Sequence, residues 1–94
     1  MSVRELRDTA QTQGAHVLGF VAQSCGPCLQ QRPIWDALAE EVLLVDVDAF
    51  PDLRARYGVE ALPTTVVLGP AEPLVLRGVQ TTRQLHEALG SPVG

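Results

Sequence analysis

The sequence contains no lysine, and seven arginines are its only strongly basic side chains. The arginines are scattered along the 94 residues and are outnumbered by 11 acidic residues, which gives a net charge of −4. Because a nucleic-acid-binding protein concentrates basic residues in a patch or stripe, no nucleic-acid partner is predicted. No apolar run approaches the roughly 20 residues that a helix needs to cross a bilayer, so no membrane partner is predicted either.

Cysteine is also scarce, because the chain has only Cys25 and Cys28. Two cysteines cannot build the several cross-links of a disulfide-rich secreted scaffold. The opening segment, residues 1–14, is polar and amphipathic, unlike a secretory signal, so we expect a cytoplasmic protein if Met1 is the native start. The length and the 46% share of hydrophobic residues are ordinary for a globular protein, and we expect a single domain over residues 1–94.

Hydrophobic periodicity and capping signals divide the chain into alternating helices and strands. Capping boxes at residues 2–5 and 81–84 predict the start of the first and the last helix. Asp48 is expected to cap the third helix, and Pro33 is expected to kink the second. The second helix is marked by apolar residues at helical spacing, namely Leu29, Trp35, Leu38 and Val42. The expected helices span residues 2–12, 29–42, 49–58 and 81–90, and the expected strands span residues 16–22, 43–48, 64–69 and 73–79.

The element order α-β-α-β-α-β-β-α predicts a mixed sheet. The first two strands are separated by a helix and should pair in parallel through a right-handed crossover, whereas the last two should form an antiparallel hairpin. Helices on both faces of such a four-stranded sheet make a three-layer α/β/α sandwich. The sequence therefore predicts an α/β fold.

The two cysteines lie within Ser-Cys-Gly-Pro-Cys at residues 24–28, where a predicted strand gives way to a helix. Backbone amides in the first turn of a helix lack internal partners and carry partial positive charge. A thiolate at Cys25 is stabilised there, so the pKa of this thiol should fall below the usual value of about 8.5. Cys28 lies one turn later on the same side, and Gly26 and Pro27 allow a tight turn that starts a helix. Two sulfurs held in this way can form a disulfide and open it again.

A structural zinc site and a structural staple are the alternatives for this pair. Zinc needs four ligands, and the two imidazoles, His16 and His86, fall at the far end of the preceding strand and on the last helix. A zinc site would therefore need a dimer that shares two cysteine pairs. A staple is weak because closing so short a loop removes little entropy from the unfolded chain. The residues favour a redox-active dithiol, with no metal and no organic cofactor.

From residue 15 to residue 90 the sequence resembles thioredoxin. Cys-Gly-Pro-Cys at residues 25–28 looks like the active-site tetrad of that family, and Pro33 matches the proline that kinks the helix behind it. The segment Tyr-Gly-Val-Glu-Ala-Leu-Pro-Thr at residues 57–64 is similar to the family's Tyr-Gly-Ile-x-x-Ile-Pro-Thr. Arg77 and Gly78 precede the last helix as a basic residue and a glycine do in the family.

The resemblance implies the thioredoxin fold and a role for each residue of the site. Cys25 and Cys28 are expected to be the catalytic thiols. The residues expected to shape the site are Gly26, Pro27 and Pro63, and those expected to bind the substrate are Ser24, Leu62, Thr64 and Gly78. Pro63 is expected to follow a cis peptide bond and to lie beside the thiols, where an extended peptide could pair with the backbone around Leu62.

Several features of the family are missing from the sequence. Ser24 stands where thioredoxins usually have a tryptophan, Gly19 where they have a buried aspartate, and Leu44 where they have a lysine that partners it. The aspartate is thought to help deprotonate the second cysteine, so Cys28 lacks its usual base and water is the expected proton acceptor. The family's first strand is expected to be absent, and Trp35 is expected to pack in the core rather than to contact substrate.

The sequence thus predicts a thiol–disulfide oxidoreductase that reduces protein disulfides through a cycle of Cys25 and Cys28. We expect a monomer whose substrates are disulfide-containing proteins and whose electrons come from an external reductant such as a thioredoxin reductase. Two alternatives stay open. The chain could be a thioredoxin-like binding module with little turnover, or a dedicated electron carrier or redox sensor for one partner.

Overall fold

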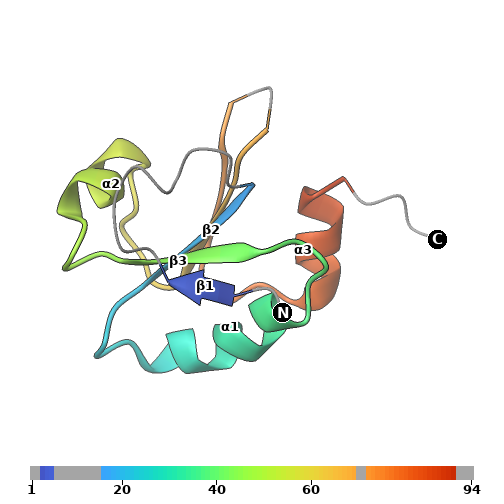
Figure 1. Ribbon diagram of the computed structural model, residues 1–94, viewed down its shortest axis with the longest axis horizontal. Coiled ribbons are helices and arrows are strands. Elements are labelled where there is room, and N and C mark those ends of the chain that lie inside the picture. Colours follow the sequence, from blue (N-terminus) through green and yellow to red (C-terminus); the bar gives the residue numbers. More distant parts are fainter. Residues whose placement is uncertain (1–2, 6–15, 70–71, 91–94) are drawn as a thin grey trace.

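A computed structural model describes residues 3–5, 16–69 and 72–90 of the chain (Figure 1). The helices are α1 (Gly26–Asp36), α2 (Pro51–Arg56) and α3 (Thr82–Ala88). The strands are β1 (Val3–Glu5), β2 (Val17–Val21), β3 (Val42–Asp46), β4 (Thr64–Val67) and β5 (Leu74–Arg77). Within this part of the chain, no helix has the length and apolar character that crossing a membrane requires.

The strands form one sheet in the order β1-β3-β2-β4-β5. Strands β1, β3 and β2 run parallel, whereas β4 pairs antiparallel with β2, and β5 pairs antiparallel with β4. The α1 crossover therefore joins two parallel strands, and the last two strands are the predicted hairpin. All four predicted strands and their mixed pairing are confirmed.

The opening helix predicted for residues 2–12 is wrong over residues 3–5, which form strand β1. Val3 pairs with Val42 and Glu5 pairs with Leu44, so β1 adds a fifth strand at the edge of the sheet. Pairing with the open edge of β3 outweighs the capping signal, because tertiary context routinely overrides weak local preferences. The expected absence of the family's first strand is therefore also wrong. Residue 2 and residues 6–12 lie outside the described residues.

A hydrophobic core lies on each face of the sheet. One cluster packs between the sheet and α2 through Leu53, and the other packs between the sheet and helices α1 and α3 through Trp35 and Leu85. Successive residues of a strand contribute to opposite clusters, as Val17 and Leu18 do, because side chains alternate across a sheet. Figure 1 shows α1 and α2 on opposite sides of the sheet. The three-layer α/β/α sandwich is confirmed.

Helix α1 differs from its prediction in length and in the face that it buries. It ends at Asp36, and the predicted helical residue Val42 instead begins β3. The periodicity places Leu29 on the apolar face, but its side chain is 71% exposed. The residues of α1 that are buried are Cys28, Gln31 and Trp35. A polar side chain thus occupies a core position next to the cysteines.

Helix α2 begins without the expected cap. Its N-cap residue is Phe50, whose side chain makes no capping hydrogen bond, and Pro51 is in the first turn as predicted. Asp48 is two residues too early to cap this helix. Its backbone N–H instead donates to Oδ1 of Asp46 at 2.8 Å, which tightens the turn that follows β3.

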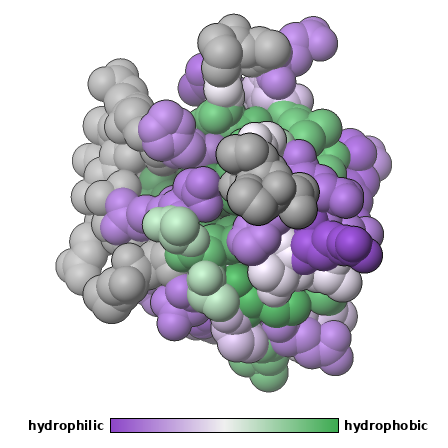
Figure 2. Space-filling view, turned by 90° about the vertical axis from the view of Figure 1, so that its right-hand side faces the viewer, coloured by the Kyte–Doolittle hydropathy of each residue, from purple (hydrophilic) through white to green (hydrophobic). Residues whose placement is uncertain are grey.

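Helix α3 begins with the predicted capping box. The backbone N–H of Gln84 donates to Oγ1 of Thr81 at 3.1 Å, and Thr81 N–H donates to Oε1 of Gln84 at 2.8 Å. Leu85 is fully buried against the sheet. The opposite side of α3 faces outward in Figure 2, where hydrophilic residues surround smaller hydrophobic areas. This face lies away from the N-terminal end of α1.

Replacing Thr81 with alanine should lower the free energy of unfolding by about 1 kcal/mol, because one first-turn amide of α3 loses its partner. Thermal or urea unfolding followed by circular dichroism measures the loss. Thr82→Ala is the matched control, since Thr82 is exposed at the next position and does not occupy the N-cap. Equal stability of the Thr81 variant and wild type would contradict the capping role.

Candidate active site

Cys25 lies just before the first turn of α1, a few residues after β2 ends. It is the N-cap residue with an extended backbone (φ −87°, ψ 102°), and its Sγ accepts the backbone N–H of Cys28 at 3.2 Å. The N–H of Cys25 donates to Ala22 O at 3.2 Å, which turns the chain from strand into helix. Negative charge on this sulfur would therefore be met by a first-turn amide and the positive end of the helix dipole.

The two cysteines are joined in a disulfide and have a Cα–Cα distance of 5.4 Å. Cys25 is partly exposed, whereas Cys28 is only 3% exposed. Gly26 and Pro27 are exposed and form the first turn of α1, as predicted. The accessible sulfur is thus the one at the helix N-terminus, and the second sulfur lies behind it.

No cluster of three or more metal-binding side chains occurs among the described residues. His16 is exposed just before β2 begins, so the strand separates it from the disulfide at the other end. His86 is in the last turn of α3. Neither imidazole joins the cysteines in a common site.

Pro63 follows a cis peptide bond, as predicted. The register of β2 and β4 pairs Phe20 with Thr64, so Pro63 lies at the end of the sheet from which β2 continues toward Cys25. Its carbonyl accepts the N–H of Gly78 at 2.8 Å. Gly78 has a φ of 84°, a conformation that favours glycine. Two segments distant in the sequence are thus joined at this end of the sheet.

The other residues expected to bind substrate differ from one another in how exposed they are. Ser24 is exposed next to Cys25. Leu62 is partly buried and packs against the core on the α2 side of the sheet. Thr64 is fully buried, and its hydroxyl donates to Ala61 O. The Thr64 side chain therefore supports the Pro63 segment from within and does not face outward.

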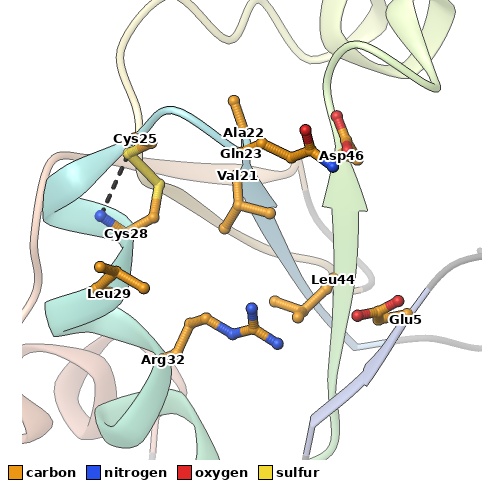
Figure 3. A pocket seen from close by; sticks show the side chains of 10 residues that line it. All are labelled: Glu5, Val21, Ala22, Gln23, Cys25, Cys28, Leu29, Arg32, Leu44 and Asp46. Carbon is orange, nitrogen blue, oxygen red and sulfur yellow. Dashed lines mark hydrogen bonds between the residues drawn. A yellow bond between two sulfur atoms is a disulfide. The ribbon is translucent and has the colours of Figure 1, made fainter.

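A pocket of about 410 Å³ lies beside the disulfide, between α1 and the ends of β1, β2 and β3 (Figure 3). Its charged side chains are Arg32 of α1, Asp46 of β3 and Glu5 of β1. Figure 3 shows the Arg32 guanidinium extending from α1 toward Leu44. The whole lining is Glu5, Val21, Ala22, Gln23, Cys25, Cys28, Leu29, Arg32, Leu44 and Asp46. Both cysteines therefore border a pocket whose lining mixes charged and aliphatic side chains.

Gly19, at the position of the family's buried aspartate, lies beneath the ring of Trp35. A Cβ atom on Gly19 would lie 2.7 Å from the Cη2 atom of Trp35, closer than carbon atoms can approach. Trp35 is fully buried, and its Nε1–H donates to Oγ1 of Thr65 at 2.9 Å. The predicted packing role of Trp35 is confirmed. Its ring fills the space in which an acidic side chain would have to lie.

Replacing Gly19 with alanine should lower the free energy of unfolding by roughly 1–3 kcal/mol, because the added methyl group overpacks the space beneath Trp35. Chemical denaturation measures this loss. Gly26→Ala is the matched control, since a Cβ at Gly26 meets no atom within 4 Å. The double variant Gly19→Ala/Trp35→Phe should recover part of the stability that Gly19→Ala loses, because the smaller ring leaves room for the methyl group. A stable single Gly19→Ala variant would contradict this account.

Gln31 is a feature of the site that the sequence analysis missed. Its side chain is fully buried one turn after Cys28. Its Nε2 donates to Gln80 O at 3.0 Å, and its Oε1 accepts Gln80 N–H at 2.6 Å. The signal in the sequence was spacing. Cys28, Gln31, Trp35 and Leu38 recur every three or four residues, as the residues on one face of a helix do, so Gln31 could have been assigned to the buried face.

Comparison with known proteins agrees with this geometry. Residues 4–91 match the family model described as Thioredoxin. The thioredoxin of Staphylococcus epidermidis is 33% identical over 89 residues, covering 87% of this chain and 86% of that protein. The thioredoxin of Staphylococcus aureus is 32% identical over 89 residues, with the same coverage of 87% and 86%.

Solved structures give the same result. Chloroplastic thioredoxin z has a TM-score of 0.80 and 25% identity, covering 96% of this chain and 93% of that one. A mutant thioredoxin from Halobacterium salinarum has a TM-score of 0.79 and 25% identity, covering 96% and 89% of the two chains. This fold, with a cysteine pair at the start of α1, defines a thiol–disulfide oxidoreductase. The chain belongs to the thioredoxin family.

Proposed function

We propose that this oxidoreductase works as a reductant of protein disulfides, with Cys25 as the nucleophile and Cys28 as the resolving thiol. The observation that carries the proposal is the asymmetry of the pair. Cys25 is partly exposed and its sulfur accepts a first-turn amide, whereas Cys28 is buried. An incoming disulfide therefore reaches Cys25 first, and the better stabilised sulfur anion is also at Cys25.

The cycle transfers two electrons to the substrate. The Cys25 thiolate attacks one sulfur of the substrate disulfide, and the other substrate sulfur leaves as a thiolate and takes up a proton. Cys28 then loses its proton and attacks Sγ of Cys25, which forms the Cys25–Cys28 disulfide and releases the second substrate sulfur. An external dithiol donor, such as a thioredoxin reductase, returns the pair to the reduced state. The protein acts in this cycle as a cytoplasmic monomer.

The substrate groove in this proposal runs along the end of the sheet that holds Pro63. Leu62 and Gly78 offer backbone along one side of it, and Ser24 borders it next to Cys25 on the other. These placements are supported by the hydrogen bond that joins Gly78 to Pro63 and by the exposure of Ser24. Leu29, exposed at 71% one residue after Cys28, adds an apolar contact for a protein substrate.

The proton of Cys28 leaves through the pocket beside the disulfide. Gly19 and Leu44 supply no base on the inner side, and Trp35 fills the space there. The pocket that Cys28 borders carries the carboxylates of Asp46 and Glu5. Water in this space accepts the proton and passes it to Asp46, the partly buried carboxylate of the two.

Cys25→Ser should abolish reduction of insulin disulfides, because no nucleophile remains. Cys28→Ser should instead accumulate a mixed disulfide between Cys25 and the substrate, because the resolving thiol is gone. Turbidity of the insulin B chain and intact-mass spectrometry under non-reducing conditions measure the two outcomes. Equal, negligible activity of wild type and Cys25→Ser would favour a binding module. Activity with one partner protein but not with insulin would favour a dedicated carrier.

Asp46→Asn should slow the release of substrate from the mixed disulfide while leaving the first attack by Cys25 unchanged. The asparagine keeps an Oδ1 acceptor for the N–H of Asp48, so the turn after β3 is retained. Stopped-flow measurement across pH separates the two steps, and Glu5→Gln is the matched control on the same pocket. An unchanged resolving step would show that Asp46 takes no part in it, and a faster one that its negative charge only disfavours the Cys28 thiolate. Either result would contradict the proton relay.

A further inference from the structure

The side-chain amide of Gln31 binds, through its oxygen and its nitrogen, the backbone of Gln80, which lies 49 positions away in the sequence. A buried primary amide is costly unless its polar atoms are hydrogen-bonded. Here the Oε1 and Nε2 atoms bind the N–H and the carbonyl of Gln80 at 2.6 and 3.0 Å. The contact therefore joins α1, one turn after Cys28, to the loop between β5 and α3.

That loop is the one that carries Gly78. The N–H of Gly78 donates to Pro63 O at 2.8 Å. The side-chain Nε2 of Gln80 also donates to Arg77 O at 3.1 Å, which closes the loop on itself. Through Gln80, Gln31 thus holds a segment that is in turn bonded to the segment of the cis proline.

A third link returns from the Pro63 segment to the same helix. Thr65, two residues after Pro63, accepts the indole N–H of Trp35 at 2.9 Å. Gln31 and Trp35 are both fully buried and lie one turn apart on α1. Helix α1, the Gly78 loop and the Pro63 segment are therefore joined in a closed ring of three contacts, each made by buried or backbone groups.

We infer that Gln31 is a positioning residue for protein substrates, which sets the distance between Cys25 at the start of α1 and the Gly78 side of the groove. This inference rests on the proposed reduction of protein disulfides in that groove. An apolar side chain of similar size would fill the same space on α1 but would leave the loop without its two bonds. A small disulfide needs only the sulfur of Cys25, whereas a polypeptide also needs the backbone on both sides of it.

Gln31→Met should raise the KM for insulin roughly fivefold or more, because the loop loses both of its hydrogen bonds to α1. The kcat should stay within about twofold of wild type, since the cysteines and the helix N-terminus are unchanged. The rate with a small disulfide, 5,5′-dithiobis(2-nitrobenzoate), should not change. Gln30→Met is the matched control, because Gln30 is exposed on the neighbouring position of the same helix.

Two further variants separate positioning from loss of stability. Leu53→Val destabilises the core where α2 packs on the sheet and should leave the insulin KM unchanged. Gln31→Leu removes the same two hydrogen bonds with a side chain of different shape, so it should raise KM as Gln31→Met does. It also provides the measurement if the methionine variant does not fold.

The outcomes are distinct. An unchanged insulin KM in both Gln31 variants, or an equal loss of rate with insulin and with the small disulfide, would overturn the inferred role of Gln31. The proposed function would not be affected by either result. Wild-type protein that reduces insulin no faster than Cys25→Ser would overturn the proposed function together with the inference. A rise in KM that is confined to insulin and to the Gln31 variants would support the inferred role of Gln31.

Discussion

The hydrogen bond from the amide of Cys28 to the sulfur of Cys25 depends on one constraint, the change from strand to helix within the few residues that separate β2 from α1. Because Cys25 stands before the first turn of α1, it faces amides that the helix cannot satisfy internally. Because Cys28 is three residues further on, it is carried around to the buried side of the same turn. The difference in exposure between the two sulfurs, and with it their division of labour, follows from this junction.

The junction is held in place by the packing of α1 on the sheet. Trp35 can lie on β2 only because Gly19 has no side chain, and its indole N–H then reaches Thr65 on the neighbouring strand β4. An acidic side chain at Gly19 and an indole at Trp35 exclude each other sterically. The loss of the buried aspartate typical of the family is therefore coupled to the tryptophan above it, and the polar surroundings of Cys28 are restricted to the pocket side.

The two capping boxes show when a local sequence pattern is sufficient to start a helix and when it is not. The one at residues 81–84 starts α3 as predicted, because the segment lies beyond the last strand and the helix reaches the core through Leu85 and, in part, Leu89. The one at residues 2–5 resembles it in sequence but precedes no helix over residues 3–5, since the edge of β3 offers backbone partners to β1. The capping pattern was similar at both sites, and the difference lay in an unpaired strand edge that is distant in the sequence.

Helix α1 shows, within the site, the same limit on what can be predicted from local sequence. The position of the cysteine pair and the packing of Trp35 could be predicted, because they follow from a compact motif and from a large apolar side chain. The cis bond before Pro63 was expected only from the resemblance to thioredoxins. The exposure of Leu29 and the burial of Gln31 were not predicted, and a buried polar residue such as Gln31 depends on a partner on another element. That partner, the backbone of Gln80, becomes visible only when the chain has folded.

The sequence by itself determined the alternation of helices and strands, the strand-to-helix junction at Cys25 and the spacing of the two thiols, since these depend on residues close together in the chain. Only the tertiary structure decided that β1 joins the sheet, that Trp35 occupies the space above Gly19 and that Gln31 binds the loop of Gly78. Each of these joins residues far apart in the sequence, and its free energy comes from groups that meet only in the folded state.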